Sequence, residues 1–343
     1  MSPLTTLTTH LRGVLLVTPW LLALLVQDAL LSLLYLVVRP LAPTLAYRYS
    51  SRIAYSCWAC IQLIFVRLNG ARIVVSSDDA ATLRLMQTEH ESAVVIANHV
   101  AWSDFYMIQQ VALRCGMLGY CRYFAKAQLK KVPLLGWGLM AMGMPLVTRN
   151  WQHDRRELTR VFHGITHQHF PTWLISFSEA TRFSRSKLRE SQDWCAANNR
   201  PHPGPHLLYP RTKGFVATVS HVRQAEHVKA VYDLTIAYQK KNQVKDAKDG
   251  KGGRGGWMQA PAFWETLSVP RLSERVDGYR FEVHVRRFPM EELPEDDEGL
   301  VKWIEKRWVE KGEWLESKRI EWAREEEEEE EAAAAAKLAK KTA

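Results

Sequence analysis

Apolar and polar positions follow a pattern that predicts strands separated by helices. Short apolar runs typical of buried strands occur at 71–75, 93–97, 120–125, 144–148, 172–177, 228–237 and 280–288. Helical patterns fall between several of them, at about 103–114 and 154–167. Strands that alternate with helices predict an α/β fold with a mixed, mostly parallel sheet flanked by helices. The polar segment 184–205 is expected to be a surface excursion.

The longest apolar stretch lies near the start of the chain. Residues 13–38 are almost wholly apolar, and a helix needs about 20 such residues to cross a bilayer. Asp28 interrupts the stretch, so we expect this carboxylate to face another helix, or the segment to lie partly in the membrane interface. A second stretch, 53–66, is shorter than a span and predicts an interfacial or buried helix.

These patterns divide the chain into three regions. We expect an N-terminal membrane-anchoring region at 1–70, a folded domain at 71–290 and a charged helical tail at 291–343. The glycine-rich basic segment 240–256 predicts a flexible loop. The run of Glu at 325–331 predicts a solvated helix or an extension without fixed structure.

Charge is unevenly distributed along the chain. The formal net charge is +9, and because residues 325–343 hold seven Glu and three Lys, residues 1–324 carry +13. A basic body beside an apolar anchor indicates an anionic partner, such as a phospholipid surface or a phosphorylated substrate. We expect no nucleic-acid partner, because the sequence has no recognition helix or zinc spacing. Cys57 and Cys60 lie in an apolar run without a second pair, which predicts reduced thiols and no metal site.

A histidine and a carboxylate flank the turn after the strand at 93–97. Asn98 and His99 end the strand, and Asp104 begins the next helix. If the chain bends between them, Asp104 can accept from one imidazole nitrogen while the other faces outward, which makes His99 a general base. The spacing alone more often marks a helix-capping aspartate beside a structural histidine.

Two further strands end in charged residues. The segment 143–149 ends in Arg149, and the segment 177–182 reads FSEATR and contains Glu179, Thr181 and Arg182. Charged residues at strand ends often only meet water. Placed near His99 they would instead form a basic pocket beside a general base, where the planar guanidinium suits a phosphate.

In this order the segments resemble the motifs of the glycerolipid acyltransferases of the lysophosphatidic acid acyltransferase type. The NHx4D motif stands at 98–104, the strand ending in Arg at 143–149, and the FPEGTR motif at 177–182 as FSEATR. The proline-containing fourth motif stands at 206–215, and its PRTKGF is typical of the eukaryotic branch that includes lysocardiolipin and lysophosphatidylinositol acyltransferases. Further similar stretches lie at 125–126, 132–137, 230–235 and 284–289. The resemblance covers about 90–320.

The resemblance implies that residues 71–290 are an acyltransferase domain. It implies acyl transfer from acyl-CoA, as co-substrate without a bound cofactor or metal, to the sn-2 hydroxyl of 1-acylglycerol-3-phosphate, giving phosphatidic acid. His99 would deprotonate the hydroxyl while Asp104 orients the imidazole. Asn98 is expected to support the oxyanion or the structure of the turn.

The resemblance also implies the residues that hold the substrate phosphate. They are Arg149, Glu179, Thr181, Arg182, Lys126 and Lys213. Glu179 would orient the glycerol or Arg182, and a structural salt bridge is an equal alternative. Ser178 and Ala180 replace the usual Pro and Gly, and the extra methyl of Ala180 matters only if the backbone there needs a positive φ.

Other functions stay open at this point. Within the same class, the acceptor is alternatively lysophosphatidylinositol or lysocardiolipin. A thioesterase or lipid hydrolase would use the same His–Asp pair on water, although no GxSxG motif is present. A non-catalytic membrane scaffold is a third class. The oligomeric state is not predicted.

Two features predict the location. Arg39, Arg48 and Arg52 follow the first apolar stretch while only Arg12 precedes it, which favours a cytosolic catalytic domain. Lys340 and Lys341 resemble a dilysine retrieval signal, which predicts the endoplasmic reticulum membrane.

Overall fold

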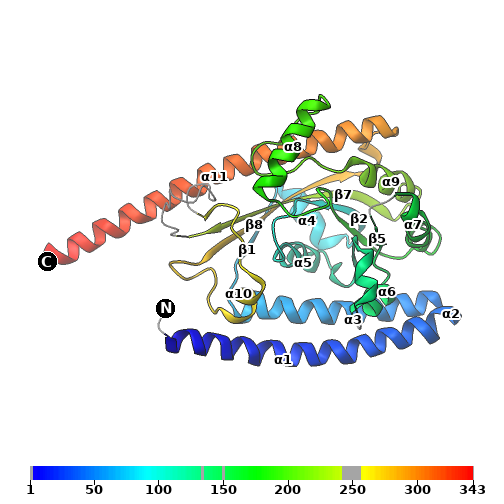
Figure 1. Cartoon of the computed structure of the whole chain (residues 1–343), viewed down its shortest axis with the longest axis horizontal. Helices are drawn as coiled ribbons and strands as arrows, with labels where there is room; N and C mark the ends of the chain where they lie inside the picture. Colours follow the sequence, from blue (N-terminus) through cyan, green and yellow to red (C-terminus); the bar gives the residue numbers. More distant parts are fainter. Residues whose placement is uncertain (1–2, 133–134, 149–150, 242–255, 343) are drawn as a thin grey trace.

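The chain forms helices around one main sheet (Figure 1), and the computed structural model describes residues 3–132, 135–148, 151–241 and 256–342. The helices are α1 (Pro3–Leu33), α2 (Arg39–Leu41), α3 (Pro43–Leu63), α4 (Ala80–Thr88), α5 (Asp104–Arg114), α6 (Leu135–Ala141), α7 (Trp151–Thr166), α8 (Arg185–Ala197), α9 (Thr212–Val222), α10 (Phe263–Ser268) and α11 (Asp297–Thr342). The strands are β1 (Ile73–Ser76), β2 (Ser92–Ala97), β3 (Cys121–Tyr123), β4 (Ala125–Lys126), β5 (Leu146–Val147), β6 (Trp173–Phe177), β7 (Val228–Lys240) and β8 (Tyr279–Pro289).

The main sheet has six strands in the order β1-β8-β7-β2-β6-β3. Its neighbouring pairs are parallel, except for the long antiparallel pair of β7 and β8. The predicted mixed, mostly parallel sheet is therefore confirmed. The run at 120–125 is divided between β3 and the short β4, which pairs with β5 in a separate two-stranded sheet.

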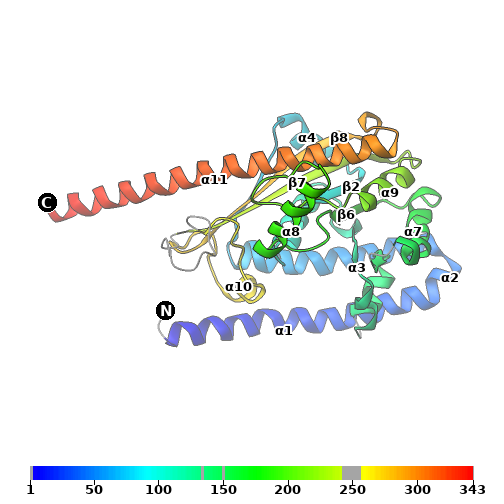
Figure 2. The same cartoon turned by 45° about the horizontal axis from the view of Figure 1, so that its top comes forward.

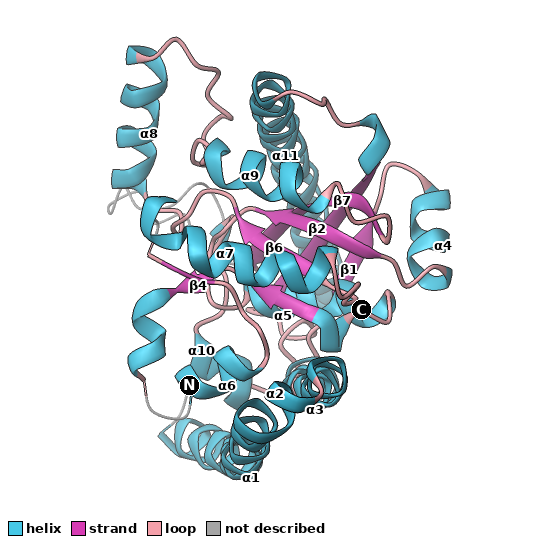
Figure 3. Cartoon of the chain, turned by 90° about the vertical axis from the view of Figure 1, so that its right-hand side faces the viewer, coloured by secondary structure: helices cyan, strands magenta, loops and turns pink. Residues whose placement is uncertain are grey.

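Helices cover both faces of this sheet, and side chains alternate between two cores. Val95 and Ile175 face the core beneath α3 and α5. Val94 and Leu174 face the other core, which α7, α9 and α11 complete. Figure 3 shows the strands between these two helical layers. Every residue of β2 is buried, so the turn that follows this strand starts from a rigid support.

Helix α1 lies along the domain in both Figure 1 and Figure 2, beside α3, and it also contacts α6 and α10. Its Arg12 donates to Asn69 Oδ1 at 2.5 Å and to the Leu68 carbonyl at 2.7 Å. Gly13 permits the close approach to α10, because a Cβ there would lie 2.7 Å from the Cβ of Ser268. The N-terminal helix is thus attached to the domain by specific contacts.

The outer face of this helix is apolar. Leu4–Leu41 is the single candidate membrane span in the described part of the chain, by length and composition, and large side chains such as Leu15, Leu22 and Leu36 are exposed on it. Asp28 is 9% exposed and faces α6, where a Cβ at Gly138 would collide with its carboxylate. The expectation that Asp28 faces another helix is confirmed.

The polar segment 184–205 is more structured than expected, and the tail, which was expected to be helical, packs more closely against the domain than expected. The polar segment 184–205 contains α8, whose N-cap Ser184 accepts from the Lys187 N–H at 3.4 Å. Helix α11 has 46 residues, and its first half buries Leu300, Trp308 and Leu315 in the core with α9. The start of the charged tail is therefore an integral part of the packed domain.

Candidate active site

His99 and Asp104 form a hydrogen-bonded pair at the carboxyl end of β2. The Asp104 Oδ2 lies 2.7 Å from His99 Nδ1 and accepts the backbone N–H groups of Val100 at 2.6 Å and Ala101 at 3.0 Å. These two bonds close the turn between β2 and α5. His99 and Asp104 lie close together although they are five positions apart, because the Asp104 carboxylate accepts the backbone N–H groups of the turn between them.

The same carboxylate determines which imidazole nitrogen is free. Its other oxygen, Oδ1, accepts the Tyr238 hydroxyl at 2.8 Å, and Asp104 is fully buried. Since Asp104 serves as an acceptor for every surrounding donor, the proton of the shared bond belongs to His99 Nδ1. The Nε2 atom then keeps its lone pair, as a general base requires.

The imidazole of His99 rests on an aromatic ring from β6. Its ring lies 4.0 Å from that of Phe177 and is inclined by 15°, and its side chain is 14% exposed. The backbone carbonyl of His99 accepts the Phe183 N–H at 2.8 Å, and the Ser178 carbonyl accepts the Arg211 N–H at 2.7 Å. The first, third and fourth motif segments are thereby brought together at one end of the sheet.

Asn98 binds the neighbouring strand. Its Nδ2 donates to the Ile236 carbonyl at 3.0 Å, and its Oδ1 accepts the Ile236 N–H at 2.8 Å. Both amide atoms therefore join β2 to β7 just before the turn. Of the two roles expected for Asn98, this geometry favours structural support over contact with an oxyanion.

Ala180 occupies a backbone conformation that suits glycine. Its φ is +56°, in the left-handed region where a Cβ costs about 1–2 kcal/mol. The condition under which the extra methyl matters is therefore met. The turn that carries Glu179, Thr181 and Arg182 is formed at a cost in strain.

Glu179 and Lys311 form the buried side of the site. Burial raises the pKa of Glu179 to about 8, with Asp104 adding to the rise, while the Leu208 and His99 backbone N–H groups and Lys311 oppose it. Neither carboxyl oxygen has a hydrogen bond of normal geometry among the described residues. Near pH 7 the side chain is therefore mainly the neutral acid, unlike a salt-bridged glutamate.

Lys311 comes from α11 and is fully buried. Its ammonium donates to Asp233 Oδ1 at 2.5 Å, to the Leu234 carbonyl at 2.7 Å and to Thr235 Oγ1 at 3.1 Å. Burial lowers the pKa of Lys311, and the attraction of Asp233 counteracts this. The C-terminal helix thus places a compensated cation behind the His99 turn.

A cleft of about 480 Å³ opens beside the His99 turn. Trp102 forms part of its wall, and Arg182 and Lys240 supply positive charge. Arg182 is exposed, so its guanidinium is accessible to a ligand in this cleft. The arrangement can hold an anion next to a histidine base.

The structure gives less support to the other predicted phosphate ligands. Thr181 Oγ1 accepts from Lys187 at 2.5 Å, and Lys213 is exposed in the first turn of α9. Lys126 is exposed on β4. Arg149 lies outside the described residues. Within the described ranges, no group of three His, Cys, Asp or Glu is placed to hold a metal ion.

Sequence reasoning missed Tyr238, Lys240 and Lys311. Tyr238 is ten positions beyond the start of β7, and its contact with Asp104 spans 134 positions. Lys311 lies in a helix rich in charged residues, where one buried lysine has no distinct local signal. The signal that was available, the stretch 230–235, marks the strand that holds Asp233.

Comparison with protein families gives two matches. Residues 77–239 match the family described as acyltransferase, and residues 274–317 match the family described as acyltransferase C-terminus. The first range contains the His99 turn, and the second contains β8 and Lys311. Together the matches cover more than half of the chain.

Named relatives are similar over most of this chain. The "1-acyl-sn-glycerol-3-phosphate acyltransferase 3" of Arabidopsis thaliana is 29% identical over 85% of the chain and 70% of its own length. The protein of Brassica oleracea named "1-acyl-sn-glycerol-3-phosphate acyltransferase 2" is 29% identical over 84% and 66%, respectively. The protein of Homo sapiens named "1-acyl-sn-glycerol-3-phosphate acyltransferase gamma" is 29% identical over 79% and 64%. The chain spans about two thirds of the length of these relatives.

Proposed function

The chain belongs to the acyltransferase family as an O-acyltransferase, and we propose that it transfers a fatty acyl group from acyl-CoA to the sn-2 hydroxyl of 1-acylglycerol-3-phosphate. The product would be phosphatidic acid. The observation that carries this proposal is the His99–Asp104 pair, with a free imidazole nitrogen, beside a cleft that contains Arg182 and Lys240. The names of the relatives supply the acceptor.

The chemistry follows from the protonation state of His99. Nε2 takes the proton of the acceptor hydroxyl as its oxygen attacks the thioester carbonyl. Asp104 stabilises the imidazolium that forms, because its Oδ2 accepts the Nδ1–H. The C–S bond then breaks, and the thiolate leaves as CoA after it receives the proton from Nε2. A thioester is already activated, so this route needs no covalent enzyme intermediate.

We assign the acceptor phosphate to the cleft beside the turn. Arg182 is the main ligand in this proposal, with Arg149, Lys126 and Lys213 as further cations and Thr181 as a hydrogen-bond donor. Glu179 is proposed to position the FSEATR turn as a neutral acid, since its carboxyl is buried behind His99. A fixed guanidinium would orient the glycerol relative to His99.

The apolar outer face of α1 is suited to membrane association. We propose that the domain works at the cytosolic surface, because Arg39, Arg48 and Arg52 follow the apolar helix while Arg12 precedes it. A lysophospholipid and acyl-CoA could then both reach the cleft at the membrane surface.

A labelled transfer assay tests the proposal. Membranes containing the wild type or His99→Ala are incubated with labelled acyl-CoA and one of three acceptors: lysophosphatidic acid, lysophosphatidylinositol or lysocardiolipin. We expect label in phosphatidic acid, and a rate lower by about 10²–10⁴ in the variant, as is typical for loss of a general base. His167→Ala is the matched control, because this histidine is exposed at the end of α7.

Each other outcome contradicts a defined part of the proposal. Label in a different diacyl lipid would replace the acceptor but keep the reaction. Free fatty acid without diacyl product would indicate a hydrolase. Equal rates for the wild type and His99→Ala would exclude His99 as the base and leave the scaffold alternative.

A further inference from the structure

A second cavity, of about 220 Å³, lies at the opposite end of the sheet from His99. Its lining includes Thr172, directly before β6, whereas Phe177 at the far end of the same strand stacks on His99. The two positions are five residues apart along an extended chain, or roughly 16 Å at about 3.3 Å per residue. The cavity is therefore separate from the cleft assigned to the substrate.

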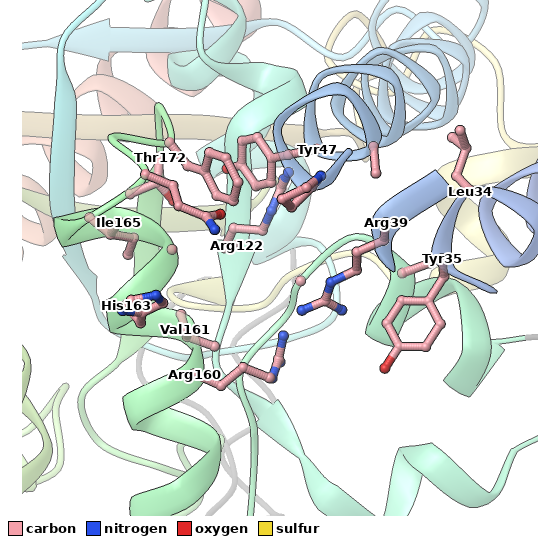
Figure 4. Close-up of a pocket in the computed structure, with 17 residues that line it drawn as sticks. Leu34, Tyr35, Arg39, Tyr47, Arg122, Arg160, Val161, His163, Ile165 and Thr172 are labelled. Atoms are coloured by element: carbon pink, nitrogen blue, oxygen red, sulfur yellow. The ribbon is translucent and has the colours of Figure 1, made fainter. Parts of the chain in front are cut away.

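Positive charge dominates this cavity. Its lining includes Arg39, Arg122, Arg160 and His163, and among the described residues it includes no Asp or Glu. Figure 4 shows the Arg39 and Arg160 side chains reaching toward one another from α2 and α7. Arg160 is paired with Glu157 at 2.9 Å, while Arg39 lies over the ring of Tyr35, 4.9 Å from its centroid. Cations that converge without a lining carboxylate favour an anionic ligand.

Arg122 supplies a donor that the protein leaves unused. It is 2% exposed, and its terminal nitrogens donate to the Gly119 and Cys121 carbonyls and to Ser51 Oγ. Its Nε is buried without a hydrogen-bond partner within the described ranges. A Cβ built on Gly143, which also lines the cavity, would meet Nε at 3.9 Å. Buried donors are rarely left unpaired, so a ligand acceptor beside this atom would remove a cost of about 1–3 kcal/mol.

The cavity also adjoins the candidate membrane span. Leu34 and Tyr35, near the end of the candidate span, form one wall, and Ile165 and Phe170 add apolar surface from the domain. Tyr and Arg at the end of an apolar helix typically lie at the level of lipid head groups. A ligand that fits has an anionic group and an adjoining apolar part.

We propose that this cavity binds the phosphate group of an anionic membrane phospholipid. The guanidinium groups of Arg39 and Arg160 and the Arg122 Nε–H contact the phosphate, and the acyl chains extend along the end of α1. This site is distinct from the acyl-transfer site and does not depend on the reaction proposed for it. Occupancy would fix the junction between α1 and α3 against the domain.

Binding of a short-chain lipid tests this proposal. The full-length protein in neutral detergent is titrated with dioctanoyl phosphatidylglycerol, a lipid that is neither substrate nor product of the proposed reaction. We expect Arg39→Glu to weaken binding at least about tenfold, the size of one lost charge-assisted hydrogen bond. Arg48→Glu is the matched control, because Arg48 is exposed on α3 and the change in net charge is the same. Its affinity is expected to stay within about twofold.

Further measurements identify the source of the phosphate and separate loss of binding from misfolding of the variant. Inorganic phosphate is expected to compete weakly, and displacement of the lipid at equal concentration would overturn the lipid assignment in favour of a free-phosphate site. Equal losses of lipid affinity in Arg39→Glu and Arg48→Glu would show that the effect comes from surface charge alone, and this result would also overturn the proposed site. If Arg39→Glu unfolds early on heating, Arg39→Gln replaces it, and unchanged affinity in that variant would exclude the site.

Discussion

The two ends of the sheet differ in how their charged side chains are paired. At the carboxyl end, Asp104, Asp233 and Lys311 are almost fully buried, and each is hydrogen-bonded to other groups of the protein. At the amino end, the buried Nε of Arg122 has no hydrogen-bond partner among the described residues, and Arg39 faces a cavity whose described lining contains no carboxylate. The His99–Asp104 and Asp233–Lys311 pairs of the carboxyl end are therefore compensated within the protein, although Glu179 beside them lacks a hydrogen bond of normal geometry among the described residues. At the amino end, the cations face an open cavity instead.

This difference distinguishes a site whose side chains are already oriented from a site whose donors are satisfied only when a ligand binds. A catalytic pair is effective when its orientation is fixed before the substrate arrives, because no reorganisation is then needed during the reaction. A binding site for an anion can leave its donors unpaired, since the ligand satisfies them. The carboxyl end therefore fits the acyl-transfer site proposed above, and the amino end fits the proposed lipid site.

The largest expected effect is that of Asp104→Asn, which removes the acceptor of the carboxyl end without changing its size. If the amide NH2 takes the place of Oδ2, it opposes the two backbone donors there and favours the His99 tautomer with the proton on Nε2. If the amide oxygen takes that place, the tautomer is kept, but the NH2 faces the Tyr238 hydroxyl and the charge that stabilises the imidazolium is lost. We expect turnover to fall by about 10⁴-fold, as in other His–Asp pairs, measured as kcat with saturating acyl-CoA.

Asp79→Asn is the matched control for this substitution. Asp79 caps α4 by accepting from the Ala81 N–H at 2.8 Å, and asparagine caps helices equally well. Turnover near the wild-type value is expected for the control. A decrease of less than tenfold in Asp104→Asn would contradict the claim that this end is preorganised around one carboxylate.

The carboxyl end was partly predictable from sequence because its main signals are local. Asp104 lies five positions from His99, and the apolar runs that form β2 and β6 are short and continuous. Lys311 was not predictable, since its partner Asp233 is 78 positions away and its helix has the composition of a solvated one. Arg122 gave no signal in the sequence either. Its two terminal nitrogens donate to residues from α3 and from the loop before β3, which leaves only Nε without a partner among the described residues.

The second largest effect is expected for Lys311→Met, which tests whether the buried charges of the carboxyl end depend on each other. The substitution leaves Asp233, 1% exposed, without its cation. Removing one partner of a buried ion pair typically costs about 3–5 kcal/mol of unfolding free energy. Thermal or denaturant unfolding in detergent measures the loss.

Two further variants make the measurement a comparison between the two ends. Lys306→Met makes the same change at an exposed position of α11, and Arg39→Gln removes a cation from the amino end. Both are expected to alter the unfolding free energy by about 0.5 kcal/mol or less. If Arg39→Gln were as destabilising as Lys311→Met, the amino end would be a structural charge cluster and the contrast between the ends would fail.

The smallest expected effect concerns backbone strain, where the two ends also differ. Ala180 at the carboxyl end has φ +56°, and Gly143 at the amino end has φ +77°. A Cβ at Gly143 would find space, with Arg122 Nε at 3.9 Å as its nearest contact, so only the dihedral angle opposes a side chain there. We expect Ala180→Gly to stabilise the protein by up to about 1 kcal/mol and Gly143→Ala to destabilise it by about 1–2 kcal/mol. Opposite shifts in the unfolding midpoint would show that backbone strain is retained at the carboxyl end and avoided at the amino end. A lower midpoint for Ala180→Gly would instead mean that the methyl group of Ala180 contributes packing that outweighs its strain.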